Sequence, residues 1–271
     1  METIGGIPAL GFGTYPLVDS EADAAIKMAL EIGFRHIDTA QMYGNEAVIG
    51  RALAAAGVPR KDLFVTTKVQ PSNLGKEAFG PSVRRSLDDL KMDRVDLLLI
   101  HWPPSDGKSI EAVIERLNIV AEQGLATHIG VSNFPIAYLR RAAAASPRQL
   151  ATNQVEYHLL IDQSTLKAAA DLLAIPLTAY CPLARGAALT HPTVVDMAHR
   201  LGEAPSTVVL TWIRQMGVIA VPMTTKRVNA TANFRSLSLQ LGPDDLAAVA
   251  AVTCVNRRLV SPSEMAKLWD R

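Results

Sequence analysis

Short apolar runs alternate with longer amphipathic stretches along almost the whole chain. The runs have the length of buried strands, and the run VDLLLI at 95–100 is apolar except for Asp96. Eight such runs predict strands at 9–13, 35–38, 63–69, 95–101, 127–132, 152–156, 177–181 and 218–222.

The stretches between these runs repeat apolar residues with the period of a helix. They predict helices at 20–32, 46–56, 75–90, 109–123, 135–145, 163–173, 192–201 and 204–216. Asn45 and Ser109 stand where a residue that caps a helix N-terminus is expected. This alternation, without a linker or a change of composition, predicts an α/β protein: a single (β/α)8 TIM barrel domain over residues 1–271 with a short N-terminal capping segment.

The structural alternative is an open, doubly wound sheet that binds a dinucleotide. Its fingerprint needs three glycines, and after Gly11 and Gly13 the third position holds Pro16. The sequence therefore favours the closed barrel.

The composition then narrows the classes of partner. The chain has 27 basic and 26 acidic residues among 271, with 49% hydrophobic and 20% charged residues, so neither disorder nor nucleic-acid binding is expected. No apolar run reaches the roughly 18 residues of a membrane span, and the first residues do not read as a signal peptide. Two cysteines are too few for a disulfide framework. These features predict a cytoplasmic protein without membrane contact, and no spacing of His, Cys or carboxylates predicts a metal site.

Polar side chains stand at the carboxyl ends of three consecutive predicted strands. Asp38 ends the second strand, Lys68 lies near the end of the third, His101 ends the fourth, and Tyr43 follows Asp38 in the next loop. Each alone has an ordinary structural explanation, such as a capped turn, a rim lysine, a packed ring or a core histidine. Four together at the end of a barrel where active sites form favour a catalytic interpretation.

These four residue types suit the reduction of a carbonyl group. A phenol is a poor acid at neutral pH, and a neighbouring ammonium lowers its pKa towards the useful range. A carboxylate keeps the ammonium charged, and an imidazole donates a hydrogen bond to the carbonyl oxygen. Since none of these groups supplies a hydride, a nicotinamide cofactor is required.

Motifs in a fixed order resemble those of the aldo-keto reductase superfamily, from Ile7 to the C-terminus. They are LGFGTY at 10–15, HIDTAQMYGNE at 36–46, TTK at 66–68, HWP at 101–103, GVSNF at 130–134, NQVE at 153–156 and AYCPL at 179–183. TTKR at 224–227 and RLVSP at 258–262 are closer to the compact bacterial 2,5-diketo-D-gluconate reductases, some of which reduce methylglyoxal.

The resemblance implies a role for each matching residue. Tyr43 would donate the proton. Lys68, paired with Asp38, would lower the pKa of the Tyr43 phenol, and His101 would orient the carbonyl. Ser132, Asn133 and Gln154 would bind the nicotinamide carboxamide, and Tyr180 would stack on the ring. The remaining cofactor contacts implied are Gly13, Thr14, Asp38, Leu183, Arg185, Thr224, Thr225, Lys226, Arg227, Asn229 and Asn233.

The sequence departs from the family pattern where the cofactor phosphate binds. Met223 occupies the position of a common lysine, and Asn229 that of a common arginine. Lys226 and Arg227 precede the next short helix, whose N-terminus favours anions, although a solvated rim pair is the alternative. NADP(H) is therefore expected to be preferred over NAD(H), with a smaller margin than is usual in the family.

The residues at the barrel mouth predict small or hydroxylated carbonyl substrates. Substrate contacts are expected from Tyr15, Tyr43, Gln70, His101 and Trp102, and an open pocket predicts broad specificity. Trp269 either covers the mouth or packs on the barrel exterior. The compact relatives are usually monomers, and no long apolar stripe demands a partner.

Two other functions stay open on the sequence alone. Some (β/α)8 aldolases form a Schiff base on a lysine at a strand end, the place of Lys68. A non-catalytic NADP(H)-binding sensor is the other alternative, although all four catalytic residue types are present.

Overall fold

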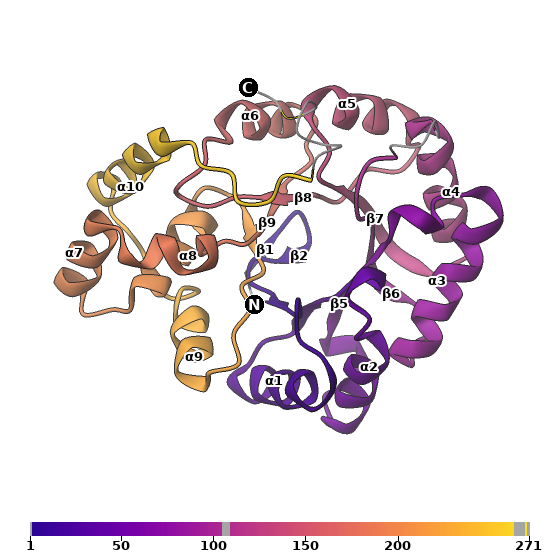
Figure 1. Cartoon of the computed structure of the whole chain (residues 1–271), viewed down its shortest axis with the longest axis horizontal. Helices are drawn as coiled ribbons and strands as arrows, with labels where there is room; N and C mark the ends of the chain where they lie inside the picture. The colour runs from indigo at the N-terminus through magenta and orange to yellow at the C-terminus, as the bar shows by residue number, and fades with distance from the viewer. Residues whose placement is uncertain (1, 105–108, 263–268, 270–271) are drawn as a thin grey trace.

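The computed structural model describes residues 2–104, 109–262 and 269, and its centre is a parallel sheet of eight strands (Figure 1). Each strand pairs with the next one along the chain. The strands are β3 (Phe12–Gly13), β4 (His36–Asp38), β5 (Phe64–Val69), β6 (Val95–Ile100), β7 (Ala126–Ser132), β8 (Asn153–Glu156), β9 (Leu177–Tyr180) and β10 (Ile219–Ala220).

Backbone hydrogen bonds join the first strand region to the last and close the sheet. Leu10 forms a parallel bridge with Ala220. Gly11 N donates to Ala220 O at 2.8 Å, and Gly13 N donates to Pro222 O at 2.9 Å. The approach at Gly13 needs glycine, since a Cβ there would lie 2.8 Å from Val221 O. The predicted (β/α)8 barrel is therefore confirmed.

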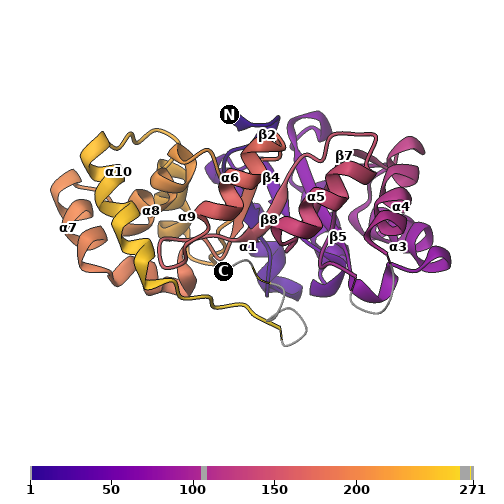
Figure 2. The same ribbon diagram turned by 90° about the horizontal axis from the view of Figure 1, so that it is seen from above.

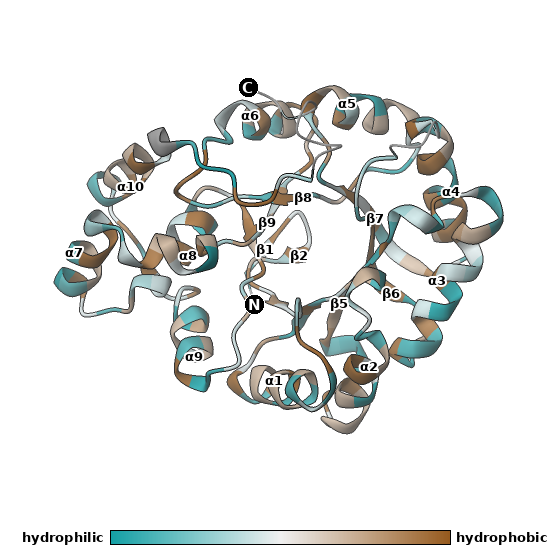
Figure 3. Ribbon diagram, viewed as in Figure 1, coloured by the Kyte–Doolittle hydropathy of each residue, from teal (hydrophilic) through white to brown (hydrophobic). Residues whose placement is uncertain are grey.

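Helices surround the strands and turn their polar sides outward (Figure 3). The helix α3, for example, buries Phe79, Val83, Leu87 and Leu90, which recur every three or four residues. The helices are α1 (Asp19–Ile32), α2 (Glu46–Ala55), α3 (Lys76–Leu90), α4 (Ile110–Glu122), α5 (Ile136–Ala145), α6 (Ser164–Leu172), α7 (Pro192–Leu201), α8 (Pro205–Gln215), α9 (Arg227–Arg235) and α10 (Pro243–Ala250). Short 3-10 helices are η1 (Gln41–Tyr43), η2 (Arg60–Asp62), η3 (Pro71–Asn73), η4 (Ala184–Thr190) and η5 (Ala251–Val255).

The predicted N-terminal capping segment is a hairpin of β1 (Thr3–Ile4) and β2 (Ile7–Pro8). It covers the end of the barrel where the strands begin, and Ile7 is fully buried with Leu97, Leu99 and Ile219. Figure 2 shows the hairpin on one side of the molecule and the yellow C-terminal segment on the opposite side. One end of the barrel is therefore plugged, and the other end carries the loops after the strands.

The structure differs from the predicted elements mainly where the barrel closes. The strands predicted at 9–13 and 218–222 are reduced to β3 and β10, because isolated backbone hydrogen bonds complete the closure. Ser109 caps α4 as expected, with its Oγ accepting from Ala112 N at 3.0 Å. Asn45 does not cap α2 with its side chain, which instead bonds to Thr39 and to Leu17 O. The helix α10 was not predicted.

The part of the chain that the structure describes contains no helix long and apolar enough to cross a bilayer.

Candidate active site

Three neighbouring strand ends bring the four predicted catalytic residues together. Asp38 ends β4, Lys68 is the last but one residue of β5, and His101 directly follows β6. Tyr43 closes η1, the turn that follows β4. Because β4, β5 and β6 are parallel neighbours, these side chains lie at the same end of the barrel, opposite the hairpin.

Lys68 lies at the centre of this group and is completely buried. Its ammonium forms an ion pair with Asp38 and donates to Thr39 O at 2.9 Å and to Tyr43 OH at 3.3 Å. These three contacts use all three of its donors. Burial alone would lower the pKa of Lys68, but Asp38 and Tyr43 together outweigh it and raise the pKa. Lys68 is therefore a fixed positive charge.

Tyr43 keeps its proton in this setting. Burial raises the pKa of the Tyr43 phenol, and the neighbouring Lys68 lowers it by less, so the pKa lies above its usual value. The expected effect of Lys68 is thus present but smaller than that of burial. The Tyr43 ring lies 5.1 Å from the ring of Tyr15 and 5.6 Å from that of His101, measured between centroids. Tyr43 is therefore a protonated phenol held between an ammonium and an imidazole.

His101 is a neutral imidazole over the physiological range. Burial, and then the charge of Lys68, lower the pKa of His101 to about 3. Among the described residues its Nδ1 has no hydrogen-bond partner and is buried. A proton on Nδ1 would have no acceptor, so Nε2 is the nitrogen that carries the hydrogen and can donate it to a ligand.

Buried neutral histidines make the fold sensitive to acid. Burial lowers the pKa of His36 to about 4, and that of His101 to about 3, from 6.5 in the unfolded chain. The unfolded chain therefore binds up to two more protons as the pH falls from 6.5 towards 4, and stability decreases by up to about 2.7 kcal/mol per pH unit from these groups. We expect urea unfolding between pH 6 and 5 to show this loss. His36→Asn should roughly halve it, and an equal slope in both proteins would contradict the prediction.

Gln154 connects the opposite side of the barrel to the ion pair. Its Nε2 donates to Asp38 Oδ2 at 2.7 Å, so that the two carboxylate oxygens of Asp38 serve Gln154 and Lys68. Ser132 Oγ in turn donates to Gln154 O at 2.8 Å. The predicted cofactor residues Ser132 and Gln154 are thus buried beside the catalytic group.

Asn133 and Tyr180 form the neighbouring wall. Asn133 has a positive φ of 63°, which turns its amide back so that Nδ2 donates to His101 O at 3.0 Å. Tyr180 OH donates to Asn133 Oδ1 at 2.8 Å. The structure therefore brings Ser132, Asn133, Gln154 and Tyr180 together as predicted, while their roles towards a cofactor stay predictions.

Gln41 and Asn45 hold the Tyr43 turn in place, although neither of them had a role in the site predicted from the sequence. Gln41 Nε2 donates to Ser82 and Ser86 of α3. Its Oε1 accepts from the backbone of Gln70 and from the side chain of Asn73. Asn45 bonds to Thr39 and to the backbone of Thr14. Both belong to the motif at 36–46, which is the sequence signal that places them near the site.

The predicted phosphate-binding residues lie on the loop after β10 and at the start of α9. Thr224 Oγ1 accepts from Lys226 N at 3.2 Å, and the Lys226 side chain is exposed. Arg227 forms an ion pair with Glu31 of α1. Thr225 and Asn229 are exposed as well. Lys226 and Arg227 therefore stand at the start of α9 as predicted, but Arg227 already has an anionic partner.

The residues present fit a dinucleotide cofactor. Asn233 on α9 is 2% exposed, and within the described residues its Oδ1 has no hydrogen-bond partner. The exocyclic amine of an adenine could donate the hydrogen bond that this oxygen lacks. The other predicted contacts lie nearer the barrel: Thr14 is buried and donates its amide to Asp38 O at 3.0 Å, Leu183 is half-buried, and Arg185 is exposed in η4.

A row of aromatic rings forms the mouth beside this site. Tyr15 is 61% exposed next to Tyr43, and the Trp102 ring lies 6.5 Å from His101. Trp269 lies 6.3 Å from Trp102, which places it at the mouth rather than on the barrel exterior. Gln70 follows β5 and is half-buried.

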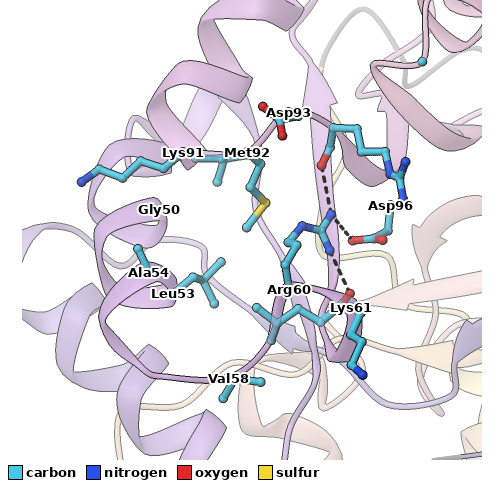
Figure 4. Close-up of a pocket in the computed structure, with 14 residues that line it drawn as sticks. Gly50, Leu53, Ala54, Val58, Arg60, Lys61, Lys91, Met92, Asp93 and Asp96 are labelled. Carbon is cyan, nitrogen blue, oxygen red and sulfur yellow. Dashed lines mark hydrogen bonds and ion pairs between the residues drawn. The ribbon is translucent and has the colours of Figure 1, made fainter.

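No second chemical centre is evident among the described residues. A cavity of about 880 Å³ lies at the opposite end of the barrel, between the ends of α2 and α3 and the beginnings of β5 and β6 (Figure 4). Its side chains include Arg60, whose guanidinium is already paired with Asp96 at 2.8 Å. No group of three His, Cys, Asp or Glu in the described part of the chain could hold a metal ion.

Comparison with known proteins agrees with this geometry. The family model described as the aldo/keto reductase family matches residues 6–253. The chain belongs to the aldo-keto reductase family. It is thus an oxidoreductase that acts on carbonyl compounds, and the family generally uses NAD(P)H.

Individual members of the aldo-keto reductase family match over almost the full length. The methylglyoxal reductase DkgB of Escherichia coli O157:H7 is 42% identical over 266 residues, which cover 97% of this chain and 99% of the relative. A crystal structure described as a candidate 2,5-diketo-D-gluconic acid reductase B has a TM-score of 0.93 and 40% identity, covering 98% of this chain and 95% of that one. The aldose reductase of Schistosoma japonicum has a TM-score of 0.90 and 30% identity, covering 96% and 93%.

Proposed function

We propose that this aldo-keto reductase reduces small aldehydes and ketones to alcohols, with NADPH preferred and NADH also accepted. The substrate class includes α-dicarbonyls such as methylglyoxal, and keto-sugar acids. The observation that carries the proposal is the Tyr43 phenol, 3.3 Å from the fully buried Lys68 ammonium and beside the neutral imidazole of His101. We further infer that the barrel is one domain that works as a monomer in the cytoplasm.

The cofactor, when bound, supplies the hydride. Tyr43 OH gives its proton to the carbonyl oxygen as negative charge develops there. Lys68, fixed by Asp38, stabilises the phenolate that remains, because the ammonium lies on the phenol oxygen. His101 Nε2–H donates a hydrogen bond to the same carbonyl oxygen and so orients the substrate.

The walls on either side of this group hold the cofactor in the proposal. Ser132, Asn133 and Gln154 bind the nicotinamide amide, and the half-buried Tyr180 ring stacks on it. Gly13, Thr14 and Asp38 line the same end. The Asn233 oxygen without a hydrogen-bond partner among the described residues supports a path of the dinucleotide towards α9. Contacts with the rest of the dinucleotide come from Leu183, Arg185, Thr224, Thr225, Lys226, Arg227, Asn229 and Asn233.

The substrate class rests on the mouth and on the relatives. Tyr15, Gln70 and Trp102 combine aromatic surface with one amide, which suits small carbonyls that carry a polar group. The name of the E. coli relative, methylglyoxal reductase, supports the same class.

The structure disfavours a Schiff-base aldolase. Such an enzyme needs a lysine with an available lone pair, whereas Lys68 uses its three donors and has a raised pKa. A sensor without activity would not require a proton donor, an ammonium and an imidazole at one point.

A direct assay tests the proposed function. Methylglyoxal, a keto-sugar acid and a simple aldehyde are each mixed with NADPH or NADH, and the loss of absorbance at the reduced cofactor's band is followed. We expect turnover with methylglyoxal and a higher kcat/KM for NADPH. Cofactor binding without turnover of any carbonyl would favour the sensor, and borohydride-trapped substrate on Lys68 would favour the aldolase.

Lys226→Ala should weaken NADPH more than NADH. Arg227 is paired with Glu31, so of the two cations at the start of α9 Lys226 is the one available to the additional phosphate. One charge-assisted contact is worth about 1.5–3 kcal/mol. We expect the Kd of NADPH, measured by fluorescence titration, to rise about tenfold or more, with the Kd of NADH within twofold. Lys91→Ala, at the other end of the barrel, is the control, and an unchanged preference for NADPH would exclude Lys226 as the phosphate contact.

A further inference from the structure

A fully buried carboxylate at the end of β8 is not used by the proposed chemistry. Glu156 is 0% exposed and lies two residues after Gln154 on the same strand. Its Oε1 accepts from Leu259 N at 2.6 Å and from His158 Nε2 at 2.9 Å, and its Oε2 accepts from Val260 N at 2.8 Å. Two of these three donors are backbone amides that lie more than one hundred residues further along the chain.

The tautomer of His158 shows that all three partners of Glu156 donate an N–H group to the carboxylate. Leu160 N donates to His158 Nδ1 at 3.2 Å, so Nδ1 carries a lone pair. The proton of the neutral ring is then on Nε2, which donates to Glu156. The carboxylate therefore holds the C-terminal segment (residues 256–262) by two amides while a third donor fixes its orientation.

The C-terminal segment connects this carboxylate to the mouth of the active site. Arg257 N donates to Leu160 O, which adds a second attachment to the barrel. Further along, Ser261 Oγ accepts from Trp269 Nε1 at 3.0 Å, and the Arg258 guanidinium lies 4.1 Å from the centre of the Trp269 ring. Trp269 packs on Trp102, whose ring lies next to His101.

We propose that Glu156 is a positioning residue that sets substrate specificity through the C-terminal segment. By holding the amides of Leu259 and Val260, it keeps Trp269 against Trp102, and the two indoles form an apolar wall for the substrate. This wall lies beyond His101, so it contacts a substituent that extends past the reacting carbonyl. The inference rests on the proposed function. Within the α-dicarbonyls, the wall adds a contact for those with an aromatic or long apolar substituent, a contact that methylglyoxal does not reach.

The neutral amide cannot replace the carboxylate at this position. In Glu156→Gln one oxygen becomes an NH2 group, which is a donor that faces donors. At least one buried N–H loses its acceptor, and the segment is released from the barrel. This change is expected to raise KM only for substrates that reach Trp269, whereas a general loss of stability would affect all substrates alike.

The test compares phenylglyoxal with methylglyoxal in the full-length protein. For Glu156→Gln we expect the KM of phenylglyoxal to rise about tenfold, the KM of methylglyoxal less than threefold, and kcat to stay within threefold. Trp269→Ala should give the same pattern, and the double variant should be no worse than Trp269→Ala alone. Glu46→Gln is the matched control, a buried carboxylate that accepts from Thr67 and Ser86 and should not change the ratio of the two KM values.

Hydrogen exchange supplies a readout that does not need activity. The amides of Leu259 and Val260 should exchange at least tenfold faster in Glu156→Gln than in the wild type. Unchanged exchange, an equal rise in both KM values, or additive effects in the double variant would each overturn the proposal. If Glu156→Gln does not fold, Ser261→Ala provides the test, because it removes only the hydrogen bond to Trp269. An unchanged ratio of the two KM values in this variant would contradict the proposed wall. If the wild type reduces no carbonyl, the proposed function fails while the exchange experiment still tests the anchor.

Discussion

Tyr43→Phe is expected to lower kcat for carbonyl reduction by about a thousandfold or more, within the range that general acid catalysis contributes. The substitution removes the hydroxyl that accepts from Lys68 at 3.3 Å, and it leaves the ring packing with Tyr15 and His101 in place. The Kd of NADPH should therefore stay within about threefold. Steady-state assays with methylglyoxal and a fluorescence titration measure the two quantities.

Tyr138→Phe is the matched control for this prediction. Tyr138 lies on α5 at the barrel exterior, with its ring 6.4 Å from Phe134. Loss of its hydroxyl should leave kcat within twofold. Retention of more than a tenth of the wild-type kcat in Tyr43→Phe would show that another group donates the proton.

Lys68→Met is expected to be the most damaging single change to stability, with a loss of about 3–5 kcal/mol in the free energy of unfolding. Asp38 is 3% exposed and would keep a buried negative charge without its cation. Thr39 O and Tyr43 OH would lose their donor as well. Urea unfolding measures the loss, and reduction should be undetectable even where the protein is folded.

The double variant Asp38→Asn with Lys68→Met separates charge from packing. Because it removes both members of the ion pair, it should regain most of the stability that Lys68→Met loses. Activity should not return, since no ammonium lies beside Tyr43. A double variant as unstable as the single one would show that the volume of the lysine side chain, and not its charge, is what the core requires.

The sequence predicted the strand ends well because their signal is local. A buried parallel strand is a short apolar run, and its polar last residue marks the rim, so Asp38, Lys68 and His101 were identified from single segments. The closure of the barrel was also predicted, although its hydrogen bonds left β3 and β10 only two residues long. Strand length at the seam depends on backbone geometry that no side-chain pattern records.

What the sequence did not predict depends on contacts between distant segments. The motif at 153–156 marked Gln154 for the cofactor but gave no sign that Glu156 holds amides near position 260. The partner of Arg227, Glu31, lies 196 residues away along the chain. The upward shift in the pKa of Tyr43 also needed the fold, because burial has to be weighed against the charge of Lys68.

The hydrogen bond from Gln154 to Asp38 joins residues 116 positions apart. During synthesis, β4 and β5 leave the ribosome well before β8. Asp38 and Lys68 are therefore present before Gln154, whose side-chain amide donates to Asp38. Contacts of such separation form late, because a long loop has to close first. A growing chain therefore lacks the Gln154 hydrogen bond until β8 has been made, and the group around Asp38 is complete only when most of the barrel exists.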